Sequence, residues 1–233
     1  AIYQSGGTLT IKDSVTTDDS KPSFISNTGV TSGAIYFAGQ SISVNNAVFN
    51  ENKATNGVGA AITLNSGGTN RTLNIADSSF TKNSATHSGG AVYTGDVPTV
   101  VERSFFNENS TSTAAGYGGA IHNSSTLEIT ASQFKNNTAS KSGGAISGNM
   151  VSISDSSILT GNKAQAEGGA VNCLGIATIS DSKFNSNSAG TYGGAIYAGG
   201  LLLSNSTVNS NTSDANGGAI TVGNYALTPT FTT

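Results

Sequence analysis

Short runs of alternating apolar and polar residues cover most of this chain, and they return at nearly regular intervals. The clearest recurring element is a step of small residues followed by a branched apolar residue. The alanines of eight such steps are spaced 27, 30, 29, 25, 25, 25 and 24 residues apart, and a period in this range predicts a repeat architecture. The steps are Gly33-Ala34-Ile35, Ala60-Ala61-Ile62, Gly89-Gly90-Ala91-Val92, Gly118-Gly119-Ala120-Ile121, Gly143-Gly144-Ala145-Ile146, Gly168-Gly169-Ala170-Val171, Gly193-Gly194-Ala195-Ile196 and Gly217-Gly218-Ala219-Ile220.

A second landmark in each unit is a large apolar residue followed three positions later by Asn. In one unit the spacing is ambiguous, because either Ile158 or Leu159 could fill the apolar place before Asn162. The other pairs are Phe24 and Asn27, Phe49 and Asn52, Phe80 and Asn83, Phe106 and Asn109, Phe134 and Asn137, Phe184 and Asn187, and Val208 and Asn211.

Apolar residues also lie seven and five positions before the Phe place, as Leu127 and Ile129 do before Phe134. This period of two predicts strands rather than helices. Each unit then contains three short strands, of the patterns Ala-Ile-x-apolar, Leu-x-Ile and Ser-x-Phe, separated by turn-forming Gly, Asn, Asp and Ser. We predict an all-β fold, a right-handed parallel β-helix (β-solenoid) of about eight coils of ~25 residues.

In this fold the Ile, Val, Leu and Phe side chains stack inside, and the Asn side chains form a buried ladder that satisfies the turns. A leucine-rich repeat would need several Leu and a helical segment, and a β-propeller would need aromatic signatures; neither pattern is present. Longer spacings predict insertions that bulge outward around Thr17–Pro22, Asn65–Arg71 and Ser110–Ala115.

Composition narrows the function. The net charge is −3, and the 10% of residues that are charged are scattered without runs, which argues against nucleic acid and against a polybasic membrane contact. The single cysteine, Cys173, allows no internal disulfide. No stretch approaches the ~20 apolar residues of a transmembrane helix. We expect one domain over residues 1–233, as part of a longer exported protein.

The Gly-Gly-Ala step followed by Ile or Val, together with Phe-x-x-Asn, resembles the polymorphic outer-membrane proteins of chlamydiae and the passenger repeats of other bacterial autotransporter adhesins. The resemblance runs from about Phe24 to Ile220. It implies a β-helix that is extracellular or at the outer membrane, works as a host-cell adhesin, and reaches the membrane only through an anchor or barrel domain outside this chain. In that family both motifs are associated with adhesion. The resemblance therefore marks the motif residues given above as binding residues, except for Ala60, Ala61, Ile62, Ile158, Leu159, Asn162, Val208 and Asn211.

Two units depart from the family motif. The second has Gly59-Ala60-Ala61 in place of Gly-Gly-Ala, and the first has Ser32-Gly33-Ala34.

Candidate chemistry is sparse. Glu102 and Glu128 occupy outward strand positions in adjacent units and could lie near each other, but two solvated carboxylates explain them as well. His87 and His122 have no partner at the spacing of a zinc site or a catalytic triad, and both are expected at the surface. Cys173 falls at an inward position and is expected to be a small buried hydrophobe. We therefore expect no cofactor, no metal and no enzymatic activity.

An aspartate recurs three positions before the Phe place, at Asp77, Asp155 and Asp181, whereas Asn46 and Asn205 fill this place elsewhere. A calcium site would need several oxygens converging on one point. The interchange with Asn indicates instead a short polar side chain in a turn.

The position after each branched residue of the Gly-Ala step should point outward. These residues, called the outward strip below, are Tyr36, Thr63, Tyr93, His122, Ser147, Asn172, Tyr197 and Thr221. Tyrosine is enriched in binding surfaces, so Tyr36, Tyr93, His122 and Tyr197 are candidate binding residues, and Tyr117 and Tyr192 could extend the surface. The same composition also follows from the preference of aromatic residues for exposed strand positions.

The main hypothesis is a non-enzymatic bacterial surface or secreted adhesin that binds a host-cell protein, a glycan or matrix. One alternative is self-assembly through the open edges of the solenoid. A polysaccharide lyase or glycosidase is the third reading, but it would need a cleft of converging carboxylates.

Overall fold

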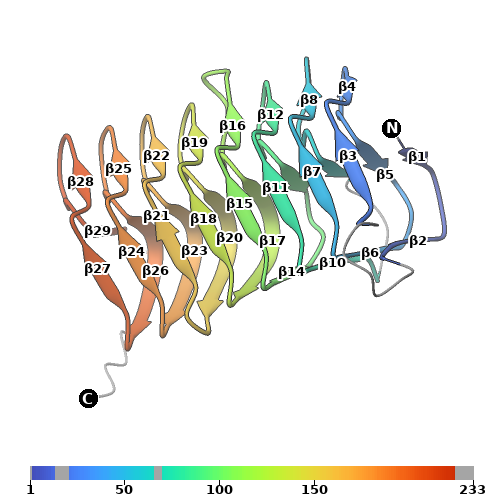
Figure 1. Ribbon diagram of the computed structural model, residues 1–233. Coiled ribbons are helices and arrows are strands. Elements are labelled where there is room, and N and C mark those ends of the chain that lie inside the picture. The colour runs from blue at the N-terminus through green and yellow to red at the C-terminus, as the bar shows by residue number, and fades with distance from the viewer. Residues whose placement is uncertain (1, 14–20, 66–69, 224–233) are drawn as a thin grey trace.

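The chain forms an elongated rod of stacked coils (Figure 1). The computed structural model describes residues 2–13, 21–65 and 70–223, and within these ranges it contains 29 strands and no helix. In the described part of the chain, all paired strands are parallel, as between β5 and β9 or between β20 and β23. The predicted all-β solenoid of about eight coils is confirmed. In the described part of the chain, no helix could cross a membrane.

The largest sheet, sheet A, has 13 strands. It contains the strands that follow the Gly-Ala step in every coil. Four coils begin with two separate strands, and four later coils begin with one long strand. The separate strands are β1 (Ile2–Gln4), β2 (Thr8–Ile11), β5 (Ile35–Phe37), β6 (Ser41–Asn45), β9 (Ile62–Leu64), β10 (Thr72–Ala76), β13 (Val92–Thr94) and β14 (Thr99–Glu102). The long strands are β17 (Ile121–Thr130), β20 (Ile146–Ser154), β23 (Val171–Ser180) and β26 (Ile196–Ser204), followed by β29 (Ile220–Val222).

Sheet B has eight strands and contains the Phe place at the centre of each. They are β3 (Ser23–Ile25), β7 (Val48–Asn50), β11 (Ser79–Thr81), β15 (Phe105–Asn107), β18 (Gln133–Lys135), β21 (Ile158–Thr160), β24 (Lys183–Asn185) and β27 (Thr207–Asn209).

Sheet C has eight strands of two residues each, directly after the ladder Asn. They are β4 (Thr28–Gly29), β8 (Lys53–Ala54), β12 (Ser84–Ala85), β16 (Ser110–Thr111), β19 (Thr138–Ala139), β22 (Lys163–Ala164), β25 (Ser188–Ala189) and β28 (Thr212–Ser213).

Three sheets around the coil are thus confirmed, with four strands per coil where the sheet A part is split, but the composition of the strands differs from the sequence pattern. The Ala-Ile and Leu-x-Ile strands share sheet A, and the third sheet is the two-residue sheet C. Two residues are too few to display a period of two, so sheet C was not visible in the alternation.

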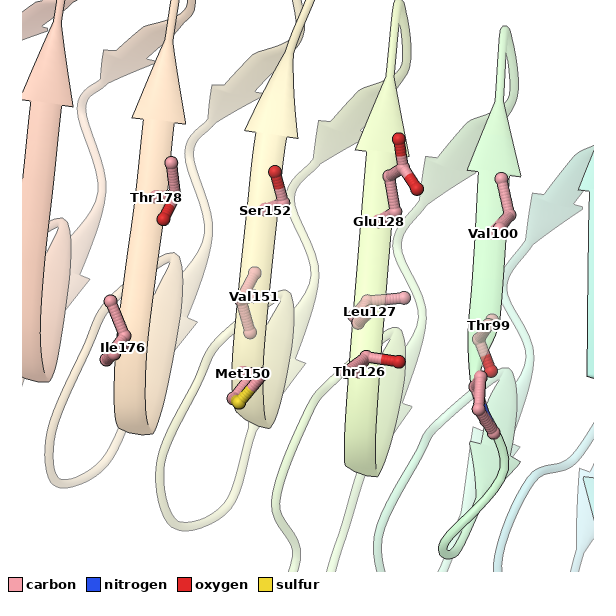
Figure 2. Close-up of a pocket in the computed structure, with 11 residues that line it drawn as sticks. Thr99, Val100, Thr126, Leu127, Glu128, Met150, Val151, Ser152, Ile176 and Thr178 are labelled. Atoms are coloured by element: carbon pink, nitrogen blue, oxygen red, sulfur yellow. The ribbon is translucent and has the colours of Figure 1, made fainter.

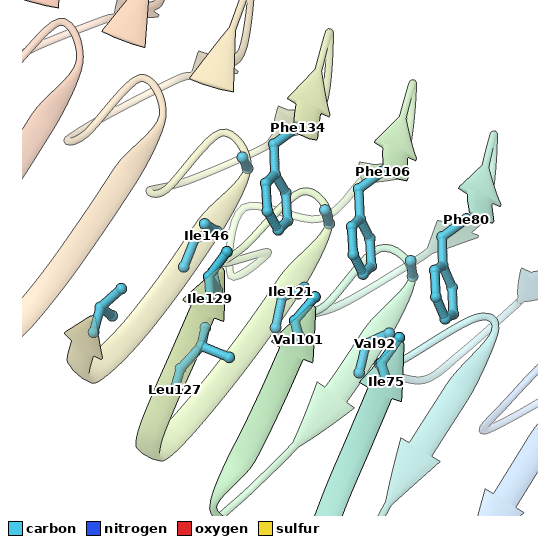
Figure 3. Packing of buried hydrophobic residues seen from close by; sticks show 14 of the residues in the cluster. Ile75, Phe80, Val92, Val101, Phe106, Ile121, Leu127, Ile129, Phe134 and Ile146 are labelled. Atoms are coloured by element: carbon cyan, nitrogen blue, oxygen red, sulfur yellow. The ribbon is translucent and has the colours of Figure 1, made fainter. Parts of the chain in front are cut away.

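The interior is a set of columns, each made of equivalent residues from successive coils (Figure 3). Phe80 stacks on Phe106 with ring centroids 4.6 Å apart and planes 2° apart, and Phe106 stacks on Phe134 at 4.7 Å. These three side chains are fully buried. Each coil therefore covers the rings of its neighbours, and the core stabilises only coils that are in register.

The Asn ladder forms as predicted. Nδ2 of Asn137 donates to Oδ1 of Asn162 at 3.0 Å and to the carbonyl oxygen of Phe106 at 3.0 Å. The backbone N–H of Asn137 donates to the same Oδ1 at 3.0 Å. Both residues are fully buried, so each amide satisfies polar groups that would otherwise be desolvated without a partner. The Asn ladder therefore links every coil to the next.

The ambiguous unit is resolved by its register. Leu159 pairs with Phe134 and Phe184 and is fully buried, whereas Ile158 is only partly buried. The extra residue lies in the preceding turn, where Asp155 and Ser156 both have a positive φ.

Because of this insertion, Ser157, two residues before Leu159, occupies the serine position of the Ser-x-Phe pattern in this unit. Its Oγ accepts a hydrogen bond from the backbone N–H of Ser132 at 3.2 Å.

The two glycines of the Gly-Gly-Ala step have different roles. Gly143 has a φ of +70°, a conformation that side chains disfavour. A Cβ on Gly144 would collide with the carbonyl oxygen of Gly169 in the next coil. The first glycine therefore makes the turn, and the second lets adjacent coils approach.

Of the predicted insertions, only parts lie in the described ranges. Residues 17–20 of the first and 66–69 of the second lie outside them. In the third, the N–H of Gly116 donates to the carbonyl of Thr113 at 2.8 Å, which forms a turn after β16.

Candidate functional site

The outward strip is one continuous ladder along sheet A. Tyr36 pairs with Thr63, Thr63 with Tyr93, and Tyr93 with His122. The register continues through Ser147, Asn172 and Tyr197 to Thr221. The sequence therefore placed these residues correctly relative to one another.

Their exposure is lower than expected for a free strand face. Thr63, Ser147 and Asn172 keep only 2%, 3% and 3% of their surface accessible, and the strip's aromatic side chains are half-buried. The cause is visible at Thr63, whose hydroxyl donates to the carbonyls of Val58 (2.7 Å) and Gly59 (2.9 Å). The turn before the Gly-Ala step therefore covers Thr63, and the hydroxyl of Thr221 makes the same kind of contact with the carbonyl of Asn216 at 3.2 Å.

Two adjacent coils contribute to an aromatic cluster at this strip. Tyr93 stacks on His122 with centroids 5.4 Å apart and planes 15° apart, and Tyr117 lies tilted over His122 at 6.0 Å. The ammonium of Lys141 lies 4.6 Å from the centroid of the Tyr117 ring. These residues, Tyr93, Tyr117, His122 and Lys141, are called the aromatic cluster below.

Burial and one hydrogen bond shift the pKa values of two side chains in the aromatic cluster. Desolvation lowers the pKa of His122 to about 4, so its ring is neutral at pH 7. Its Nδ1 is buried and has no hydrogen-bond partner in the described part of the chain, while Nε2 lies 3.4 Å from the Ser124 hydroxyl. The hydrogen bond to Tyr117 raises the pKa of Lys141, so this half-buried side chain is cationic at pH 7.

A cavity of about 420 Å³ lies at the other end of the strip. Tyr3 and Tyr36 form one wall, with ring centroids 5.5 Å apart and planes 13° apart, and Val30 to Ser32 form the other. The strip thus carries two ring pairs, separated by the small buried Thr63.

The two candidate carboxylates do not converge. Glu128 pairs with Val100 on the neighbouring strand, and Glu102 pairs with Thr130. Glu102 accepts a hydrogen bond from Arg103 at 3.1 Å. This arrangement does not provide the facing acid and base of a glycosidase.

The recurring aspartates lie in turns. Asp77, Asp155 and Asp181 have φ values of 51°, 56° and 48°, and Asn46 and Asn205 at the same place have 52° and 45°. Asp and Asn tolerate this left-handed conformation better than other side chains do, which explains their interchange. Among the described residues, no three His, Cys, Asp or Glu side chains form a group that could hold a metal ion.

Cys173 is fully buried, as predicted. Its thiol donates to the carbonyl of Asn149 at 3.2 Å, and burial raises its pKa to about 11. A protonated, enclosed thiol is a poor nucleophile.

The two histidines differ from the expected surface positions. His87 is half-buried, with Nδ1 3.3 Å from the Thr86 hydroxyl, and His122 lies beneath Tyr117.

Sequence reasoning missed a second surface feature, on the outer face of the Leu-x-Ile part of sheet A. A hollow of about 430 Å³ crosses four adjacent coils there (Figure 2). One rim contains Pro98, Thr126, Met150 and Ile176, and the other contains Val100, Glu128, Ser152 and Thr178. This feature is called the sheet A groove below. Its signal was present in the sequence, because Met150 and Ile176 are apolar at positions where alternation requires a polar residue.

The motif residues themselves are mostly interior. In the central coils, Phe134, Asn137, Ala145 and Ile146 are fully buried. Exposure rises only near the ends of the rod, as at Phe24, Asn27 and Gly217. The motifs therefore maintain the coil, and substituting them changes the fold before it changes any surface contact.

The fold and this surface define a class, a parallel β-solenoid built from one repeat that carries an outward strip of aromatic side chains. Three segments, residues 77–95, 131–149 and 181–199, match the Chlamydia polymorphic membrane protein repeat. Each contains a complete Phe-x-x-Asn and Gly-Gly-Ala pair, which confirms the resemblance on which the sequence analysis relied. Searches of curated proteins and of solved structures gave no match.

Proposed function

We propose that this chain is the adhesive part of a non-enzymatic bacterial surface protein, and that it binds a component of host cells or matrix through the outward strip. The observation that carries the proposal is the aromatic cluster, where three rings and a cation from two adjacent coils meet at the outward strip. Rigid aromatic side chains give a large contact area at low entropic cost. The repeat match supports a surface or outer-membrane location, because the repeat is that of a membrane protein family.

The test is binding of the purified chain to cultured host cells, with Tyr117→Ser as the variant. Tyr192→Ser is a matched control, because Tyr192 also precedes a Gly-Gly pair and is 39% exposed, but it is not part of the aromatic cluster. The unfolding midpoint of each variant is measured by circular dichroism. Loss of binding in Tyr117→Ser alone, with the fold intact, supports the proposal. Full binding by that variant moves the adhesive site away from the aromatic cluster, and a parent chain that does not bind contradicts adhesion.

Light scattering separates adhesion from the self-assembly alternative. A particle size that grows with concentration, together with no binding to cells, favours self-assembly. Turnover of a polysaccharide would contradict the non-enzymatic assignment.

A further inference from the structure

The sheet A groove has a simple geometric origin. Its two rims are separated by one inward-facing residue per strand, Leu127 or Val151, so a furrow about 7 Å wide runs along the rod between them. The same furrow in earlier coils is bordered by Ser41 and Ser43, which are short and polar. In the sheet A groove, Pro98, Val100, Met150 and Ile176 are apolar rim residues, while Thr126, Ser152 and Thr178 keep a hydroxyl.

Exposed apolar side chains lie at and next to the sheet A groove as well as at the ends of the rod. Met150 is 47% exposed and Leu174 is 62% exposed, and both belong to central coils whose other large apolar side chains are mostly buried. Leu202, 45% exposed, continues the rim of Thr178 in the next coil. Exposed apolar clusters of this kind mark binding surfaces, and methionine adapts its shape to different partners.

The charge of the sheet A groove is negative and unbalanced. Glu128 is its single charged lining residue, and its ladder neighbours are Val100 and Ser152. No ion pair involves Glu128 in the described part of the chain. Arg103, which follows β14, is held by both carboxylate oxygens of Asp77, at 2.8 and 2.9 Å. A cationic partner can therefore pair with the exposed Glu128 without breaking an ion pair of the described residues.

The topology restricts how a partner could bind. The strands β14, β17, β20 and β23 are each hydrogen-bonded to a neighbour on both sides, so this face offers no free strand edge. A partner therefore cannot add a strand to the sheet and has to bind through side chains.

We infer that the sheet A groove binds a protein segment that places an apolar side chain against Met150 and Ile176 and a lysine or arginine against Glu128. This site is separate from the outward strip and does not depend on the adhesive role proposed above. Apolar contact supplies the affinity, and the carboxylate selects a cationic segment over an anionic one.

The absence of tryptophan from the chain makes a direct test possible, since all tryptophan emission then comes from the probe. The probe is an acetylated, amidated tetrapeptide of sequence leucine–tryptophan–lysine–leucine, and the comparison peptide has glutamate in place of lysine. Both are titrated with the purified chain while fluorescence anisotropy is recorded. We expect the lysine peptide to bind about tenfold more tightly than the glutamate peptide, with the difference shrinking as salt is added.

Variants assign the site. Glu128→Gln should weaken binding of the lysine peptide by about threefold to fivefold, and Met150→Ser should weaken binding of both peptides. Glu108→Gln is the matched control, because Glu108 is an exposed carboxylate beside sheet B, and Tyr117→Ser reports on the outward strip. Neither control should change peptide binding.

Three outcomes overturn the inference. They are equal binding of the two peptides, no effect of Glu128→Gln, and no binding at millimolar peptide. Sedimentation adds a fourth: a parent dimer that Met150→Ser converts to a monomer would mean that a second copy covers the sheet A groove.

Discussion

The coils before residue 100 and the coils after residue 120 build the same corner of sheet A in two ways. In the earlier coils, separate strands such as β5 and β6 are joined by a short connection. In the later coils, one strand passes through the corner with an irregularity in register, between Gly148 and Val151 in β20. The corner of the earlier coils is called wide and that of the later coils narrow, by the size of the inward side chain that fills each.

The inward side chain at this corner is large in the earlier coils and small in the later ones. Phe37 and Leu64 fill it in the earlier coils, while Gly148, Cys173 and Ala198 fill it in the later ones, and all five positions belong to one column. The difference teaches that side-chain volume and backbone path are set together in a close-packed interior.

A polar contact marks the change from one type of corner to the other. Nδ2 of Asn123 donates to the hydroxyl of Thr94 at 2.8 Å and to the carbonyl of Val97 at 2.8 Å, and the hydroxyl of Thr99 lies 3.1 Å from the same nitrogen. This buried amide fills a corner of intermediate size and satisfies the backbone of the connection.

The largest effect should come from emptying the wide corner. Leu64→Ala removes a fully buried side chain and should lower the free energy of unfolding by about 3 to 4 kcal/mol, because the surrounding coils cannot close the cavity. Cys173→Ala, in the narrow corner, should cost about 1 kcal/mol or less. Urea denaturation followed by circular dichroism measures both. Similar losses for the two variants would show that corner width does not matter.

The close approach of coils gives the next largest effect. Gly144→Ala should lower the free energy of unfolding by about 2 to 3 kcal/mol, because its new methyl group meets the backbone of Gly169. The second unit already has Ala60 at this place, fully buried in a small cluster with Ala54 and Ala85. Ala60→Gly should therefore cost only about 1 kcal/mol. If Gly144→Ala unfolds at the same urea concentration as the parent, the close approach of the coils does not require glycine at this place.

A smaller, pH-dependent effect belongs to His122, beside the boundary between the two regions. Its pKa falls from 6.5 to about 4 on folding, so the unfolded chain takes up the proton first. The stabilising contribution is complete above about pH 6.5 and is lost as the pH falls toward 4. Between pH 7 and pH 5 the parent should lose at most about 2 kcal/mol more than His122→Gln does. Parallel denaturation curves at the two pH values would contradict this.

The smallest effect should come from the surface pair of Asp77 and Arg103. The guanidinium hydrogen bond holds the pKa of Asp77 below its usual value, but both side chains are about half exposed. Water and salt screen such pairs. Arg103→Gln should leave the urea midpoint within experimental scatter at high salt, and a clear drop there would show that the pair is less screened than its exposure indicates.

Much of the fold could be predicted because every repeat unit needs the same inward apolar residues and the same buried polar side chain at its turn. Phe134 and Asn137 follow from alternation and from the need to satisfy a buried turn, and both occupy the predicted columns. The register of the outward strip followed for the same reason, since Tyr93 and His122 hold equivalent positions in adjacent units.

The parts that were missed depend on contacts that no single unit displays. Sheet C was too short to show a period, and the burial of Thr63 depends on a turn that folds back onto the strip. The sheet A groove needed the side chains of four coils to be seen together, although Met150 had already broken the alternation.

The Asn ladder has a consequence for how such a chain can change its length. The amide of Asn137 meets that of Asn162, which lies 25 residues later, and Asn162 meets Asn187 at the same interval. Removing the 25 residues from Thr138 to Asn162 would bring Asn137 opposite Asn187, with every amide partnered again. Removing a few residues would leave donors and acceptors unmatched on both sides of the cut. Whole coils are therefore the units in which this rod can be shortened or extended, and its reach can vary without redesign of its interior.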